Sequence, residues 1–103
     1  MGGPTQAIRM HDIAQAAGVP VWCGGLLETG VGRAANLALA SLPNFSLPAD
    51  LSASDRYFEE DIIEPPVRLG PGGMIPVPTA PGLGVAVRLD RIDAATTRHA
   101  LFR

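Results

Sequence analysis

A short apolar run that leads through a glycine-rich turn into a helical pattern is the feature that most constrains this fold. Residues 19–23 are apolar without alternation, which predicts a strand buried on both faces, as in a parallel sheet. Gly24 and Gly25 follow at once and let the backbone approach a ligand closely, while the next helix directs unpaired N–H groups toward the same place. Glu28 adds a carboxylate there, so we expect the chemistry of the chain at this turn.

Helical patterns lie on both sides of this run. Residues 4–17 repeat apolar side chains on one face, and Gly18 suits the position just after the helix. Residues 31–42 form the second pattern, which Thr29 or Gly30 is placed to cap. The apolar face predicted for the first helix consists of Ala7, Met10, Ala14 and Ala17, with Ile13 beside it.

The first half of the chain has the rhythm of an α/β barrel. Residues 45–50 predict a second short strand, although Pro48 lacks a backbone donor. The two strands start 26 residues apart, close to the roughly 30 residues per βα unit of an eight-fold barrel. Two parallel strands do not form a stable sheet alone, because both faces need helices and the edges need partners. We therefore interpret this half as part of a larger α/β structure.

After Asp50 the chain becomes irregular and leans toward β structure. Short strands are predicted over residues 74–77 and 85–89, and Asp90 or Asp93 is placed to cap a terminal helix. An acidic stretch precedes them, and its spacing fits no cation-binding loop, so we expect it to form a solvated face. This stretch consists of Glu59, Glu60, Asp61 and Glu64.

Composition excludes several functions. The net charge is −2, and all eight basic side chains are arginines that form no stripe, which argues against a nucleic-acid partner. One cysteine and two histidines far apart provide neither a disulfide framework nor a zinc site. No apolar run approaches the roughly 20 residues of a membrane span, and no signal peptide is present, so a cytoplasmic protein is expected. The chain also has no lysine, hence no amine base.

Five motifs together resemble one family of enzymes. They are IRMHD at residues 8–12, GVPVWCGGLLETGVGRA at 18–34, LASLPNF at 39–45, DLSASDRY at 50–57 and DIIEP at 61–65. In these motifs the chain is similar to the C-terminal part of the enolase superfamily, in the branch of o-succinylbenzoate synthase and N-acylamino acid racemase.

This resemblance implies a fold and a reaction. The fold is a modified (β/α) barrel of the TIM type, in which residues 1–55 form the last two βα units and residues 56–103 return to the capping domain. The reaction is proton abstraction beside the carboxylate of a small-molecule substrate, with two lysines as bases and Mg²⁺ held by three carboxylates. It leads either to dehydration or to racemisation, and the full-length enzyme is expected to be a homo-oligomer.

The resemblance also implies that this chain is incomplete as an enzyme. The strands that bear the lysines and the metal ligands lie upstream in the family, so we expect no metal ligand here. Met1 is expected to mark a truncated start, with the missing N-terminal part of the enzyme as partner. The chain alone is expected to be inactive.

Candidate site residues follow from the same resemblance. Glu28 matches a carboxylate that supports the enolate side in related lactonizing enzymes, and Trp22 and Cys23 are expected in the core. Two groups are expected to contact substrate, one along the loop and one at the exit of the second strand. These substrate-binding candidates are Gly24, Gly25, Leu26, Ser52 and Asp55.

The residues themselves leave simpler interpretations open. Glu28 also suits an acid in the first turn of a helix, where the helix dipole favours it. Gly24 and Gly25 also suit a plain turn, and Asp55 suits an ion pair with Arg56 beside it. His11 is interpreted as structural or solvated.

Two other function classes remain as alternatives. Residues 30–35 match G-x-G-x-x-A, and Asp50 follows Gly30 by 20 residues, which is the spacing of a dinucleotide-binding unit. Against it, six residues separate Cys23 from Gly30, and no further βα unit follows Asp50. The second alternative is a non-catalytic remnant that folds only on a partner.

Overall fold

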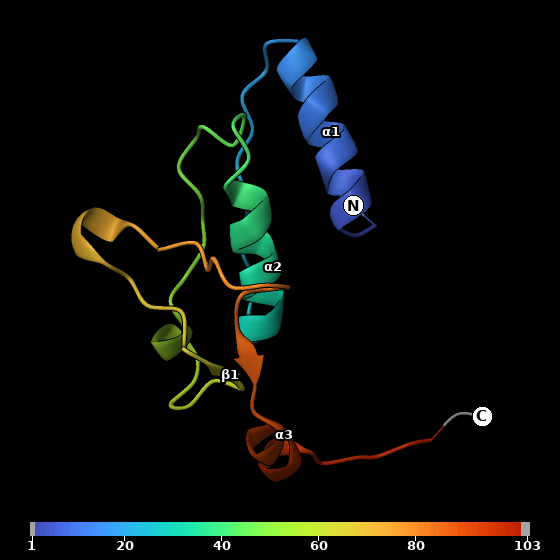
Figure 1. The fold of residues 1–103 in the computed structure, drawn as a ribbon, viewed down its shortest axis with the longest axis vertical. Helices are drawn as coiled ribbons and strands as arrows, with labels where there is room; N and C mark the ends of the chain where they lie inside the picture. Colours follow the sequence, from blue (N-terminus) through green and yellow to red (C-terminus); the bar gives the residue numbers. More distant parts are fainter. Residues whose placement is uncertain (1, 102–103) are drawn as a thin grey trace.

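The computed structural model describes residues 2–101, so Met1 lies outside the described residues. Figure 1 shows α2 between α1 on one side and a small strand pair with α3 on the other. No helix among the described residues is long and apolar enough to cross a membrane. The elements are α1 (Pro4–Ala16), α2 (Gly30–Ala40), the 3₁₀ turn η1 (Ser54–Arg56), β1 (Ile63–Glu64), the 3₁₀ turn η2 (Pro71–Gly73), β2 (Ala86–Val87) and α3 (Leu89–Ala95).

The first predicted helix is confirmed, but only part of its predicted apolar face is buried. α1 has a proline in its first turn, and Gly18 ends it at φ 68°, a left-handed conformation that glycine adopts without strain. Ala7 and His11 are the buried side chains, whereas Met10 and Ile13 are exposed. α1 packs against part of α2 and is bound to the Asn44 segment through His11, while its other large apolar side chains stay uncovered.

His11 is structural, as one of the two interpretations held. Its Nε2 accepts a hydrogen bond from the Asn44 N–H at 3.1 Å, while its Nδ1 lies 2.9 Å from Asp12 Oδ1. Its ring also stacks on Phe45, with centroids 5.8 Å apart. His11 thus ties α1 to the segment after α2.

The second predicted helix is confirmed together with its cap position. Thr29 is the N-cap of α2, although its side chain makes no capping hydrogen bond. Ala34 and Leu37 are buried, so the apolar stripe of α2 faces the core as its periodicity requires.

The two predicted parallel strands do not form regular strands. Residues 19–23 and 45–50 run in the same direction and share two backbone hydrogen bonds, for example from Asp50 N–H to the Cys23 carbonyl at 2.9 Å. Pro20 and Pro48 lack donors, and no further strand flanks the pair among the described residues, so a ladder does not develop.

The second half holds one short antiparallel pair. β1 and β2 pair with Ile63 opposite Val87, which confirms strand structure inside residues 85–89, whereas residues 74–77 form a loop. α3 confirms the terminal helix, but neither Asp90 nor Asp93 is its N-cap, because α3 begins one residue before Asp90 with Arg88 at the cap position.

The core lies between α2 and the second half of the chain. Leu37, Ile63 and Val67 form its buried centre, and Ile63 is completely buried. The core thus joins residues on both sides of position 55, where the sequence predicts a boundary between two units; that division stays a prediction. The partly buried residues packed against the centre are Val31, Leu51, Ile62, Ile75 and Val85.

Candidate functional site

The glycine turn lies against the backbone at the end of residues 45–50. A Cβ atom at Gly25 would collide with the carbonyl oxygen of Asp50 and would lie 3.4 Å from Leu51 Cδ2. At Gly24 the nearest atom to a Cβ is a carbon of the Trp22 ring at 3.4 Å, an ordinary contact. Position 25 therefore requires glycine for a close backbone approach, whereas position 24 has room for a small side chain.

The Glu28 carboxylate is held by two hydrogen bonds. Oε1 accepts one from the Leu26 N–H at 3.1 Å, and Oε2 accepts one from Asn36 Nδ2 at 2.6 Å. Arg33 Nη2 also donates to the Glu28 carbonyl at 3.0 Å. Glu28 precedes the N-cap Thr29, so it is not the first-turn acid that its sequence position allowed. Its carboxylate has a defined place beside α2 instead.

The neighbours of Glu28 in the loop are more open than the sequence predicts. Trp22 is 54% exposed rather than part of the core, and Leu26 and Leu27 are 82% and 74% exposed. The described residues supply no element over this side of the loop, which explains the exposure. Cys23 is half-buried; burial raises the pKa of its thiol above the ordinary value of 9.0, and the negative charge of Glu28 raises it further.

Ser52 and Asp55 contact residues other than the loop. The Ser52 hydroxyl lies 3.3 Å from the Tyr57 hydroxyl, and this hydrogen bond, helped by Arg56, lowers the pKa of Tyr57. Asp55 forms an exposed ion pair with Arg68 at 3.5 Å, so the predicted pairing with Arg56 is wrong. Asp55 lies in the 3₁₀ turn η1, next to Arg56, and its partner Arg68 follows β1 in the sequence.

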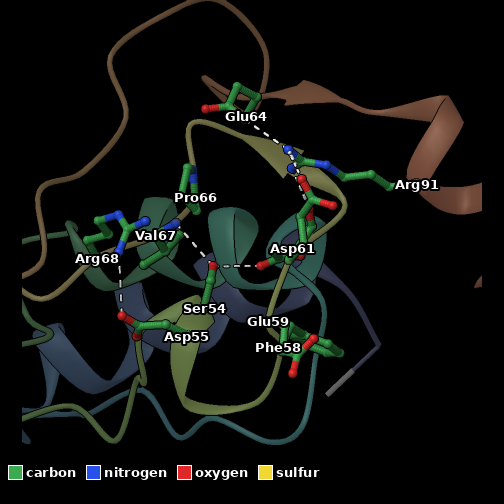
Figure 2. A pocket seen from close by; sticks show the side chains of 11 residues that line it. Ser54, Asp55, Phe58, Glu59, Asp61, Glu64, Pro66, Val67, Arg68 and Arg91 are labelled. Atoms are coloured by element: carbon green, nitrogen blue, oxygen red, sulfur yellow. Dashed lines mark hydrogen bonds and ion pairs between the residues drawn. The ribbon is translucent and has the colours of Figure 1, made fainter.

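Asp55 lines a cavity of about 390 Å³ in the second half of the molecule. Figure 2 shows this cavity, with Ser54 between Val67 and Asp61 and with Arg91 reaching toward Glu64. Neither Glu28 nor the glycine turn lines it. The structure therefore groups the candidates in two places: Gly24, Gly25, Leu26 and Glu28 in the loop, and Ser52 and Asp55 around η1.

Asp61 is the site residue that sequence reasoning missed. It belongs to the acidic stretch predicted to be solvated, yet its side chain is completely buried, whereas Glu59, Glu60 and Glu64 are exposed as expected. Oδ1 accepts hydrogen bonds from the Gly30 and Ile62 N–H groups, both at 2.8 Å. The only local signal was its place directly before an apolar pair, which did not identify these partners.

The dinucleotide alternative does not match this geometry. Gly30 and Gly32 lie inside the first turn of α2 rather than in a loop before it. The Gly30 N–H, which would face a phosphate in such a unit, donates to Asp61 Oδ1.

The residues present do not fit a metal centre. Among residues 2–101, no group of three or more His, Cys, Asp or Glu side chains lies close enough to hold a metal ion. Asp61, the most buried acid, has its carboxylate occupied by N–H and O–H donors.

Comparisons with known proteins now identify the class. The family model for enolase C-terminal domain-like proteins matches residues 1–91, and the chain belongs to this family. Its fold is accordingly a portion of the α/β TIM barrel of the enolase superfamily.

Two relatives indicate the branch of the superfamily that the chain is similar to. The chain is 60% identical over 97 residues to an N-succinylamino acid racemase from Amycolatopsis, covering 94% of this chain and 26% of that protein. It is 47% identical over 102 residues to the o-succinylbenzoate synthase of Bacillus subtilis, covering 99% and 27%. The chain thus spans about a quarter of the length of these curated relatives.

Solved structures agree with this placement. An enolase-superfamily member from Listeria innocua superposes with a TM-score of 0.84 at 43% identity, over 90% of this chain and 25% of that one. A muconate lactonizing enzyme from Klebsiella pneumoniae superposes with a TM-score of 0.82 at 29% identity, over 94% and 27%. The arrangement described above therefore corresponds to about a quarter of each of these larger chains.

Proposed function

We propose that this chain supplies the C-terminal part of a cytoplasmic enzyme of the o-succinylbenzoate synthase and N-acylamino acid racemase branch. The observation that carries the proposal is the 60% identity to a racemase over nearly the whole chain, which includes the complete loop of residues 24–29. The reaction would be proton abstraction beside a substrate carboxylate, followed by dehydration or by return of the proton. The partner of the chain is the upstream part of such an enzyme.

The chain would contribute one wall of the substrate site. Glu28 is fixed by Leu26 and Asn36, and each of its oxygens keeps further acceptor capacity. It would orient a proton-bearing group beside the enolate side of the substrate. Gly25 lets the loop lie close to the backbone at Asp50, and the exposed Leu26 side chain would contact the substrate.

The chain would not supply the bases. It contains no lysine, and its described residues form no metal-ligand cluster. In the enzymes that the chain resembles, Mg²⁺ stabilises the negative charge of the enediolate. Its ligands would come from the partner segment. Ser52 and Asp55, which lie around η1, would line the distal end of the pocket rather than its reactive centre.

Two measurements test this proposal. The purified chain is incubated with Mg²⁺ and an N-succinylamino acid in D₂O, and exchange of the α proton is followed by NMR. We expect no exchange. The chain then replaces the matching C-terminal segment of the Amycolatopsis racemase, and we expect this chimera to racemise the substrate. In the chimera, Glu28→Gln should lower kcat by about 10²-fold, the scale of losing one preorganised polar group.

The control is Glu59→Gln, which makes the same chemical change at an exposed acid outside the loop. It should leave kcat unchanged. Exchange by the chain alone would overturn the assignment of the bases to the partner. A folded chimera in which Glu28→Gln leaves kcat at the level of Glu59→Gln would overturn the role of Glu28.

A further inference from the structure

Asp61 is buried and yet fully supplied with partners. Its Oδ2 accepts a hydrogen bond from the Ser54 hydroxyl at 2.6 Å and lies 3.7 Å from Arg33 Nη1. Its Oδ1 accepts the Gly30 and Ile62 N–H groups. A buried carboxylate is tolerated only with such compensation, so the cluster specifies one geometry of these segments.

The hydrogen bond from the Gly30 N–H to Asp61 takes the place of the side-chain cap that α2 lacks. Thr29 occupies the N-cap position without a side-chain hydrogen bond, and the first turn of α2 contains no acid. Asp61 places its negative charge at this end of the helix and accepts the Gly30 N–H from 31 residues away. A Cβ at Gly30 would collide with Ile63 and lie 2.7 Å from Asp61 Oδ2, so glycine at this position admits the capping segment.

The same helix holds Glu28 at two points. Arg33, one turn into α2, donates to the Glu28 carbonyl at 3.0 Å. Asn36, one turn further, donates to Glu28 Oε2 at 2.6 Å. The start of α2 is therefore fixed by Asp61, and the place of the Glu28 carboxylate is fixed by α2.

We propose that Asp61 is a positioning residue for Glu28: it caps α2 from the second half of the chain and thereby sets where the Glu28 carboxylate lies. Ser54 supports it, because its hydroxyl donates to Asp61 Oδ2 while its oxygen accepts the Val67 N–H at 3.1 Å. The placement of Glu28 by Asp61 stands on the contacts alone; its effect on turnover rests on the proposed function.

The placement is tested in this chain by hydrogen exchange of individual amides. Asp61→Asn keeps the shape and removes the charge, and Ser54→Ala removes one donor to Asp61 as a milder variant. Both should raise the exchange rates of the Gly30 and Leu26 amides, by about tenfold for Asp61→Asn and by less for Ser54→Ala. The Leu26 amide reports the position of Glu28, because it donates to the Glu28 carboxylate. The Ala17 amide at the end of α1 should not change, and the control Glu60→Gln should change none of the three.

The consequence for turnover is tested in the racemase chimera by a double-mutant cycle. Asp61→Asn should lower kcat about tenfold with little change in KM, because the substrate contacts remain. In the Glu28→Gln background, Asp61→Asn should have little further effect, since a residue that acts through Glu28 has nothing left to position.

The outcomes separate this inference from the proposed function. Faster exchange at Gly30 with unchanged exchange at Leu26 would make Asp61 a helix cap only and overturn the inference. Equal losses of kcat from Asp61→Asn in both backgrounds would also overturn it. If Glu28→Gln itself leaves kcat unchanged, the proposed function fails, while the Leu26 amide still decides the placement.

Discussion

The side chains around Asp61 are buried, whereas those around Trp22 and the loop of residues 24–29 are largely exposed. We call these the closed and the open side of the molecule. Around Asp61, donors from separate segments meet one buried carboxylate, and the completely buried Ile63 packs beside it. Around the loop, Trp22, Leu26 and Leu27 expose most of their surface. Both sides are part of one small chain, but among the described residues only the Asp61 side is covered by other segments.

This difference indicates where the chain would meet its partner. A buried charge is expensive unless it is compensated, and the donors that compensate Asp61 come from this chain, although Arg33 Nη1 lies 3.7 Å from Asp61 Oδ2 without a hydrogen bond. Exposed apolar side chains grouped on one side are typical of a surface that another segment covers. The loop that bears Glu28 thus lies on the side that the proposed upstream part of the enzyme would complete.

The largest effect should come from one substitution made on both sides. Ile63→Ala removes a fully buried side chain of β1 that packs against the start of α2. It should lower the free energy of unfolding by about 2–5 kcal/mol. Leu27→Ala, at a side chain of the loop that is 74% exposed, should change it by no more than about 0.5 kcal/mol. Urea unfolding followed by circular dichroism measures both. Equal losses would show that the two sides do not differ in packing.

Local patterns predicted the helices and the strand inside residues 85–89, but not the absence of regular strands at residues 19–23 and 45–50. The ends of α1 and α2 follow from the proline at residue 4, from Gly18 and from Thr29, all of which act within a few residues. Residues 19–23 and 45–50 depend on neighbouring strands for their ladder, and the described chain provides only one for each. Their apolar composition therefore did not determine a regular strand here.

The Asp61 cluster was beyond sequence reasoning for a related reason. Its charge suggested a solvated face, and the acids beside it are indeed exposed. What distinguishes Asp61 is a hydrogen bond to the N–H of Gly30, 31 residues away, which no periodicity or spacing rule connects. The motifs around both residues predicted the family, and the contact itself required the structure.

The next effect compares two adjacent glycines in the open loop. Gly25→Ala introduces a Cβ that collides with the Asp50 carbonyl, and the loop must shift at a cost of about 1–3 kcal/mol. Gly24→Ala adds the same atom in ordinary contact with Trp22 and should change stability by less than about 0.5 kcal/mol. Thermal unfolding of both variants measures the difference. Similar midpoints would mean that the loop does not lie against residue 50.

The smallest effect concerns the Cys23 thiol, which lies just before the loop that bears Glu28. Cys23 is the single cysteine, so alkylation by iodoacetamide reports it alone. Burial and the charge of Glu28 raise the pKa of this thiol above 9.0, which lowers the reactive thiolate fraction at a given pH. Glu28→Gln removes the repulsive charge, so the alkylation rate should rise at pH 8, and its pH profile should move to lower pH.

The sign of this shift also fixes how pH acts on folding. A thiol whose pKa is higher in the folded chain binds its proton more tightly there, so the stability it contributes is present below the unfolded value of 9.0. This contribution is lost as the pH rises from that value through the folded pKa. The loss should be smaller in Glu28→Gln than in the natural chain, because less of the pKa shift remains. An unchanged alkylation profile in Glu28→Gln would mean that the Glu28 carboxylate does not lie near Cys23. It would contradict the defined position of Glu28 on the open side.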